Sequence, residues 1–288
     1  MRVSTAFVFQ NALRGLRRNV VASERAERQL ATGRRIQTIS DDPAGALSVM
    51  RASSQLKDIE QYQRNGSLAS VRLTTEETVL NRFGEVLERA ETVARSAASL
   101  DASDPVRQAA ITEVAALHEE IVSLANTRLG DEFIFGGTKS DVPPFKEDGS
   151  YVGGSVSQSA EIDSGVLVET GHTGDQVFGG ALEETAALLD ELRTGNQSSI
   201  SEAAEALNAS KEDASLAETE VGIRLRQIKD ATEALARRAA RTGDERDALL
   251  NADPTESAVE ALAAQTALER AYTAVSRVLS TNIMDYLR

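Results

Sequence analysis

The residues of this chain whose side chains could do chemistry are few and scattered. His118 and His172 are the only histidines, and there is no cysteine, which excludes thiolate nucleophiles, disulfides and cysteine-ligated metals. The two histidines fall in regions of different character, and His118 stands beside Glu119 and Glu120 within a stretch of helical spacing. We interpret His118 as a solvated side chain, and we expect neither a metal ion nor a cofactor.

Two short motifs could suggest catalysis, but each has a simpler interpretation. Residues 136–139, with the sequence GGTK, lack the glycine spacing of a phosphate-binding loop and follow strand-favouring residues, so they predict a hairpin turn. Asp41 and Asp42 could form an acid–base or metal-binding pair, but Pro43 follows them, and Asp before Pro is typical of a helix start. No serine lies in a recognisable motif with a histidine base. The sequence therefore predicts no catalytic site and no enzyme.

Glycine and proline divide the chain into three parts. Eleven of the 19 glycines lie between Gly130 and Gly180, whereas the flanking stretches contain few helix breakers. The three prolines outside this middle segment each follow an aspartate, at 42–43, 104–105 and 253–254. We therefore expect helices on both flanks, with starts near residues 43, 105 and 254.

The two flanks and the middle segment show different local patterns. Apolar residues in the flanks recur every three or four positions, which predicts helices, including a short one that ends near Gly195 and a longer one interrupted at Thr242-Gly243. Residues 133–135 and 165–168 favour short strands. Five of the 11 Phe and Tyr residues lie in the middle, so we expect a compact, mostly β insertion with a small core of its own.

Each end of the chain carries an apolar stripe at coiled-coil spacing. Ser23 and Glu27 interrupt the N-terminal stripe, which Leu30 rejoins. A pair of helices buries only one side of each stripe, so we predict that copies of the chain associate through them. The candidate interface residues are Phe9, Leu13, Leu16, Val20, Leu30, Leu268, Tyr272, Val275, Leu279, Ile283 and Leu287. One alternative is a closed monomeric bundle. Another is a membrane-surface helix, because residues 1–35 hold eight Arg against two Glu.

Charge and hydropathy limit the possible partners. The net charge of −14 disfavours binding to nucleic acid, because a polyanion would be repelled by most of the chain. No run of 18 apolar residues is present, so we expect no membrane span. Arg14, Arg17 and Arg18 interrupt the apolar stretch of the N-terminus, so we expect no cleaved signal peptide there.

Several sequence strings resemble the flagellin family. Residues 1–5 (MRVST), 29–36 (QLATGRRI) and 40–45 (SDDPAG) are similar to the N-terminal region of that family. Residues 133–138 (FIFGGT) and the ending 283–287 (IMDYL) resemble its hook-associated members, and the resemblance covers the chain most weakly around 155–250. Filament flagellins are the alternative within the family. Met284, where leucine is expected, and Arg288, a common flagellin ending, depart from the hook-associated pattern.

The resemblance implies a mainly α fold, a long antiparallel bundle or coiled coil formed by both termini, with a small β-rich module inserted in the middle. It implies a terminal inner-tube domain of 1–42 plus 251–288, a helical rod of 43–129 plus 181–250, and an outer module of 130–180. Expected partners are further copies in a ring, the first hook-associated protein, flagellin, and an export chaperone on the C-terminal helix. The expected location is extracellular, between hook and filament, after type III export. A coiled-coil scaffold without a flagellar role is the alternative outside the family.

Overall fold

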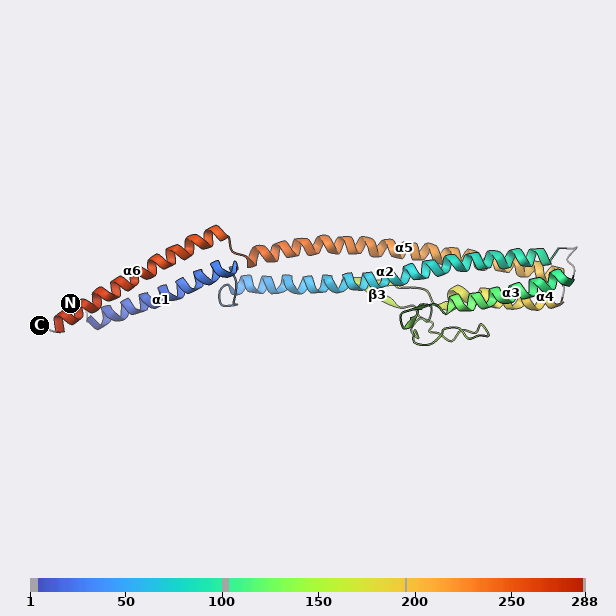
Figure 1. Ribbon diagram of the computed structural model, residues 1–288, viewed down its shortest axis with the longest axis horizontal. Coiled ribbons are helices and arrows are strands. Elements are labelled where there is room, and N and C mark those ends of the chain that lie inside the picture. The colour runs from blue at the N-terminus through green and yellow to red at the C-terminus, as the bar shows by residue number, and fades with distance from the viewer. Residues whose placement is uncertain (1–4, 100–103, 195, 287–288) are drawn as a thin grey trace. The chain divides into compact units, whose positions relative to one another are not determined.

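The computed structural model describes residues 5–99, 104–194 and 196–286 and shows a mainly helical chain with two short antiparallel strand pairs (Figure 1). This confirms the predicted fold class. The elements in chain order are α1 (Thr5–Thr32), α2 (Pro43–Ala97), α3 (Asp104–Ala125), β1 (Arg128–Leu129), β2 (Glu132–Phe133), β3 (Ser159–Asp163), β4 (Val166–Glu169), the π-helical turn η1 (Asp175–Gly179), α4 (Gly180–Thr194), α5 (Gln197–Leu250) and α6 (Pro254–Tyr286).

Aspartate caps fix the starts of two long helices at the predicted positions. The Oδ1 atom of Asp42 accepts a hydrogen bond of 2.9 Å from the N–H of Gly45 at the start of α2. At the start of α6, Oδ1 of Asp253 accepts bonds from the N–H groups of Glu256 (3.2 Å) and Thr255 (2.7 Å). These backbone hydrogen bonds are the main reason that the pKa of each aspartate lies below its ordinary value. The local sequence alone therefore sets both helix starts.

The break expected at Thr242-Gly243 is wrong, because α5 continues through both residues to Leu250. A single glycine inside a helix costs only about 1 kcal/mol relative to alanine, which packing can outweigh. Thr242 is buried, so its side chain contributes such packing.

The chain divides into two compact units, one of residues 1–57 with 238–288 and one of residues 58–237. In the second unit, α2, α3, α4 and the first part of α5 enclose a continuous hydrophobic core. Its helical members follow the three- and four-residue spacing of the sequence and include Leu73, Leu80, Phe83, Leu87, Val114, Leu117, Ile121, Leu188, Leu192, Ile200, Leu207, Val221 and Ile228. The three-part division implied by the resemblance stays a prediction.

The turn-rich segment between α3 and α4 contains both strand pairs. β1 pairs with β2 around a turn at Gly130-Asp131, and Gly130 has a φ of 63°, which favours glycine. β3 pairs with β4, and the register shifts between Glu161 and Asp163. The hairpin turn expected at residues 136–139 is therefore misplaced, because these residues form a separate turn after β2.

The aromatic residues of this segment do not form a core of their own, contrary to our expectation. The ring centroid of Phe178 in η1 lies 4.6 Å from that of Phe83 in α2 and 4.8 Å from that of Phe135. All three side chains are fully buried and belong to the same cluster as the helical core. The strands of this segment are too short to enclose the aromatic rings, so the rings pack against the helices.

Candidate assembly interface

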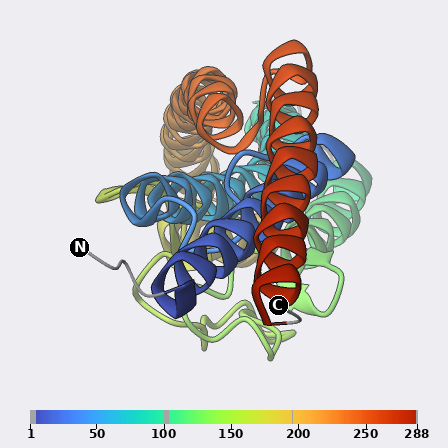
Figure 2. The ribbon, with the colours of Figure 1, turned by 90° about the vertical axis from the view of Figure 1, so that its left-hand side faces the viewer.

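The terminal helices α1 and α6 pack against each other in the first unit. Asn19 Nδ2 donates a hydrogen bond of 3.2 Å to the carbonyl oxygen of Ala267, and Gln29 Nε2 donates one of 3.5 Å to Ser257 Oγ. From Asn19 to Gln29 the chain advances ten residues along α1, while their partners go back ten residues along α6, from Ala267 to Ser257. The two helices are therefore antiparallel. Figure 2 looks onto this unit, with α1 in blue and α6 in red.

Six of the predicted interface residues lie partly or fully within this seam. Phe9, Leu13, Leu16 and Val20 recur along one face of α1, and each is only half-buried. On α6, Leu268 is half-buried, whereas Val275 is 8% exposed. The pair therefore covers one side of each apolar stripe and leaves the other side accessible to solvent.

The other predicted residues are exposed or outside the described side chains. Leu30, Tyr272 and Leu279 are exposed to 47%, 55% and 43% of their surface. The side chain of Ile283 and all of Leu287 lie outside the residues that the structure describes. The buried face of α6 is rotated toward smaller residues such as Ala264 and Ala271, which is why part of the predicted stripe faces solvent. The role of these residues in assembly stays a prediction.

The sequence pattern did not identify the polar members of the seam. Ser23 and Ser257 are almost fully buried, and Asn19 and Gln29 bond across the pair. Small and polar side chains let the helices approach closely at these positions. The interruption of the stripe near Ser23 was the only sequence signal of this change in packing.

A short backbone pairing holds the inner end of the seam. Arg34 forms an antiparallel bridge with Asn251, and the N–H of Ala252 donates a hydrogen bond of 2.9 Å to the carbonyl of Gly33. Arg35 Nη1 lies 3.1 Å from Asp42 Oδ2. Residues 33–36 and 251–253 therefore fix the ends of α1, α5 and α6 together.

Asp41 and Asp42, considered above as a possible acid–base pair, both serve the backbone. Asp41 Oδ2 accepts hydrogen bonds from the N–H groups of Thr38 (2.9 Å) and Gln37 (3.2 Å), and the bond from Thr38 is the largest cause of its lowered pKa. Asp42 caps α2. Both carboxylates are thus occupied in shaping the turn that precedes α2.

A charged cluster in the second unit surrounds His172, a residue for which the sequence pattern predicts no structural role. The buried carboxylate of Glu76 in α2 accepts a bond of 3.0 Å from the N–H of His172 and lies 2.6 Å from its Nδ1. The Nε2 atom lies 3.0 Å from Glu220 Oε2 and 3.1 Å from Arg224 Nη1, both on α5. The segment after β4 is therefore held by two helices at once.

The charges around His172 favour its protonated form. Burial lowers its pKa, but the hydrogen bonds to Glu76 and Glu220 outweigh this effect, so its pKa is raised. The bond from His172 in turn lowers the pKa of Glu220. The sequence carried one signal of this cluster: Glu76 lies on the same helical face as Leu73, Leu80 and other core residues.

His118 also differs from the sequence interpretation. It is half-buried, and its Nδ1 lies 2.7 Å from the hydroxyl oxygen of Thr185 in α4, so it is not a freely solvated side chain. Burial lowers its pKa. His118 therefore joins α3 to α4. Within the described residues, no group of three or more His, Asp or Glu side chains is arranged to hold a metal ion.

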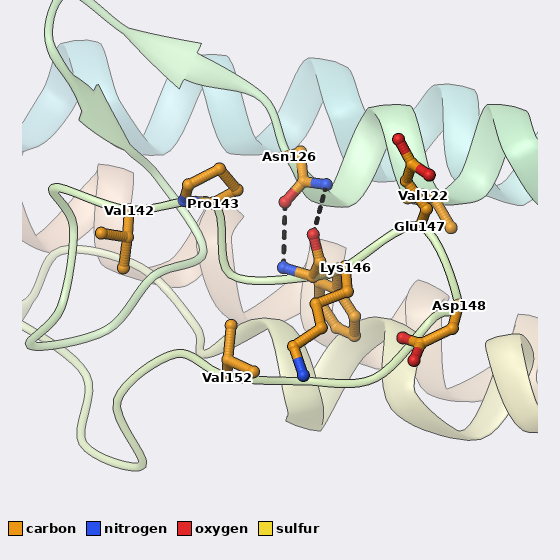
Figure 3. Close-up of a pocket in the computed structure, with 9 residues that line it drawn as sticks. Val122, Asn126, Val142, Pro143, Lys146, Glu147, Asp148 and Val152 are labelled. Carbon is orange, nitrogen blue, oxygen red and sulfur yellow. Dashed lines mark hydrogen bonds between the residues drawn. The ribbon is translucent and has the colours of Figure 1, made fainter.

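An open hollow of about 840 Å³ lies beside the loop that contains residues 142–152 (Figure 3). Asn126 at its wall donates a hydrogen bond of 3.0 Å to the carbonyl of Phe145 and accepts one of 3.0 Å from its N–H. Asp148 accepts bonds from the N–H and hydroxyl of Ser150. The polar groups here hold the loop in place and do not converge on the hollow.

The hydropathy of the helices bears on membrane spans and leaves the membrane-surface alternative untested. Among the helices that the structure describes, none combines the length and the apolar content that crossing a bilayer would require.

Comparisons with known proteins show which family the chain resembles. Residues 3–140 match the family model of the bacterial flagellin N-terminal helical region. Flagellar hook-associated protein 3 of Escherichia coli (strain K12) is 31% identical over 180 residues, which cover 62% of this chain and 57% of that protein. A flagellin of Listeria monocytogenes is 27% identical over 127 residues, 44% of each chain. The chain thus spans less than two thirds of the length of these curated relatives.

A solved structure supports the same fold. A Vibrio parahaemolyticus protein, assigned provisionally as a flagellar hook-associated protein, superposes with a TM-score of 0.66, covering 73% of this chain and 99% of that one at 23% identity. At this identity the likeness concerns the fold alone. The sequence matches confirm the predicted resemblance to the flagellin family: residues 3–140 match the model of the bacterial flagellin N-terminal helical region, and the chain is similar to flagellar hook-associated protein 3.

Proposed function

We propose that this chain is a structural adaptor of the bacterial flagellum that joins the hook, through the first hook-associated protein, to the flagellin filament. The similarity to flagellar hook-associated protein 3 extends over 180 residues, further than the 127 residues shared with the Listeria flagellin. The filament subunit is therefore the second candidate. In this proposal the chain is not an enzyme, and it works outside the cell after export without a cleaved signal peptide.

One observation supports the mechanism most directly: the α1–α6 pair leaves apolar surface exposed. Besides Leu30, Tyr272 and Leu279, the exposed apolar side chains of these two helices include Phe7, Val8, Val21, Val259 and Leu262. Burying apolar area contributes about 25 cal/mol per Å², so further copies packed around the pair would stabilise it. Apolar surface of this extent on a free chain is also a reason for an export chaperone to cover the C-terminal helix.

The proposed assembly couples ordering of the terminal helices to association. The terminal helices would bury more apolar surface in the assembly than in a free chain. They would therefore gain stability only where neighbouring copies are already in place. Growth would then occur at the tip of a ring of copies, between the first hook-associated protein on one side and flagellin on the other.

Leu279→Asp tests the seam. Leu279 is 43% exposed in the single chain, so the substitution should leave the monomer soluble and folded while placing a charge in the proposed contact between copies. We expect loss of incorporation into flagella, measured by complementation of a strain that lacks its own hook-associated protein 3. Ser276→Asp, at a neighbouring exposed position, serves as the control. Normal assembly of Leu279→Asp would contradict the proposal.

A further inference from the structure

The two compact units of this chain carry opposite net charge. Residues 1–57 and 238–288 together hold 16 Lys and Arg against 12 Asp and Glu, whereas residues 58–237 hold 15 against 33. Two helix faces show the contrast most sharply, one on α1 and one on the first part of α5.

The face of α1 opposite the seam is a basic stripe. Arg14, Arg18, Val21, Arg25 and Arg28 follow one another at spacings of three and four, and all five are exposed. Val21 stands in the middle with 61% of its surface exposed.

The guanidinium groups of this basic stripe are poorly neutralised within the chain. Arg25 and Arg28 reach carboxylates only at 3.7 Å and 3.9 Å. Among the contacts of the described residues, Arg14 and Arg18 have no carboxylate within ion-pair distance. The stripe therefore keeps most of its charge available.

The first part of α5 carries an acidic stripe of matching length. Glu202, Glu205, Ala209, Glu212 and Leu216 follow the same spacing over 14 residues, and all are exposed, Leu216 to 63%. Their described polar contacts are with neutral groups: Ser198 bonds to Glu202 at 3.4 Å and Asn208 to Glu212 at 3.3 Å. Each stripe thus combines charges that have weak or no ionic partners among the described contacts with an exposed aliphatic side chain.

The two stripes lie at different distances along their helices from the point where α1 and α5 end. Gly33, just after α1, is bonded to Ala252, two residues beyond the end of α5. Arg14 lies 19 residues from Gly33, roughly 29 Å along a helix, whereas Leu216 lies 34 residues from Leu250, roughly 51 Å. These unequal helix lengths favour a contact between stripes of different copies.

We propose that the basic stripe of α1 docks on the acidic stripe of α5 of a second copy of this chain. The inference rests on the proposed self-assembly and adds a specific electrostatic contact to it, distinct from the apolar seam. Opposite charges on the two faces steer copies into this pairing, and the contact weakens as salt shortens the Debye length from about 8 Å at 0.15 M to about 3 Å at 1 M.

Cysteine cross-linking tests the contact, because the chain has no native cysteine. Full-length Val21→Cys and Ala209→Cys chains are mixed at concentrations at which the wild type sediments as oligomers, and then treated with a short bismaleimide. As the control, Val21→Cys is mixed with Gln227→Cys, which places the cysteine at another exposed position of α5. We expect hetero-dimers of Val21→Cys and Ala209→Cys to form at least about tenfold faster than those of the control. A factor of about ten is the lower end of the rate increase that electrostatic steering produces. The excess should vanish at 1 M salt.

Charge reversal supplies the second readout. Arg14→Glu with Arg18→Glu in the Val21→Cys chain should remove the excess cross-linking, and adding Glu205→Arg with Glu212→Arg to the Ala209→Cys chain should restore it. Cross-linking no faster than the control in a chain that still oligomerises overturns the stripe contact but leaves the proposed function intact. Binding of the arginines to phosphatidylserine vesicles, with no position-specific cross-link, also overturns it. A chain that never oligomerises counts against the proposed function itself.

Discussion

His172 is the residue whose environment departs furthest from its sequence context. Its two ring nitrogens face groups from different elements: Glu76 of α2 on one side, and Glu220 and Arg224 of α5 on the other. When protonated, the ring can donate to both carboxylates. When neutral, Nδ1–H can still donate to Glu76 while Nε2 accepts from Arg224. The protonated form makes the stronger, charge-assisted bonds.

Replacing His172 with Gln should change how stability depends on pH. The pKa of His172 is raised in the folded chain, so its contribution is fully present below the unfolded value of about 6.5 and is lost as pH rises through the folded value. We expect urea denaturation of the wild type to show stability that falls as pH rises above about 6.5, and the variant to show a flatter profile. Equal slopes for the two proteins would contradict this role.

Loss of the ring should also be costly at a fixed pH of about 6. His172→Ala leaves the carboxylate of Glu76, which is 1% exposed, without its hydrogen-bonded ion-pair partner. Breaking a buried ion pair in this way typically costs about 3–5 kcal/mol. Glu76→Gln combined with His172→Ala should recover part of the loss, because it removes the unpaired charge. A free energy of unfolding that is unchanged in His172→Ala would rule out a stabilising cluster.

At the scale of elements, two of the three glycines of α2 lie in contrasting surroundings. A Cβ added at Gly66 would lie 3.3 Å from Thr232 Oγ1 and 3.5 Å from Ile228 Cγ2 of α5, whereas one added at Gly84 would meet nothing within 4 Å. Gly66 therefore lets α2 and α5 approach each other closely, and Gly84 has no such role in the described structure.

Alanine substitutions at these two sites should differ in effect. Gly84→Ala should stabilise the chain by about 0.5–1 kcal/mol, because alanine loses less backbone entropy in a helix. Gly66→Ala should gain less, and Gly66→Leu should lose about 1–3 kcal/mol through overpacking against α5. Denaturant titration of the three variants gives the comparison. A Gly66→Leu variant as stable as the wild type would mean that the two helices do not pack tightly there.

The elements were largely predictable from local sequence, whereas the contacts between distant segments were not. The Asp-Pro pairs located the starts of α2, α3 and α6, because a cap involves only neighbouring residues. The continuation of α5 through Gly243 and the shared aromatic core around Phe178 depend on tertiary packing, which no local pattern encodes. The carboxylate partners of His172 lie 48 and 96 residues away in the sequence. The only local sign of them is that Glu76 stands among the apolar residues on the core-facing side of α2.

The interface residues show the same division. The stripe spacing predicted which faces of α1 and α6 are apolar, but not that the buried face of α6 would turn toward alanines and leave Tyr272 exposed. The polar contacts that Asn19 and Gln29 make across the pair could not be deduced from hydrophobic periodicity either.

At the scale of the molecule, the two units differ in how much apolar surface they enclose. Residues 58–237 contain nearly all of the continuous core, whereas the terminal unit buries few large apolar side chains, Ile36 and Val275 among them. Local stability should follow this distribution.

Limited proteolysis of the free chain should reflect that difference. We expect trypsin to remove roughly 40 residues from each end, where Arg14, Arg17, Arg18 and Arg277 offer cleavage sites, and to leave the middle intact for longer. Mass spectrometry of the time course identifies the products. Termini as resistant as the core, or slow amide exchange throughout α1 and α6, would favour the closed monomeric bundle.

The connection between the two units consists of uninterrupted helix on both sides. α2 passes from residue 57 to 58 and α5 from 237 to 238 without a loop, and each helix exceeds 50 residues. Each of these helices therefore contributes a single ladder of backbone hydrogen bonds to both units. Unwinding either helix at the boundary would remove backbone bonds from both units at once.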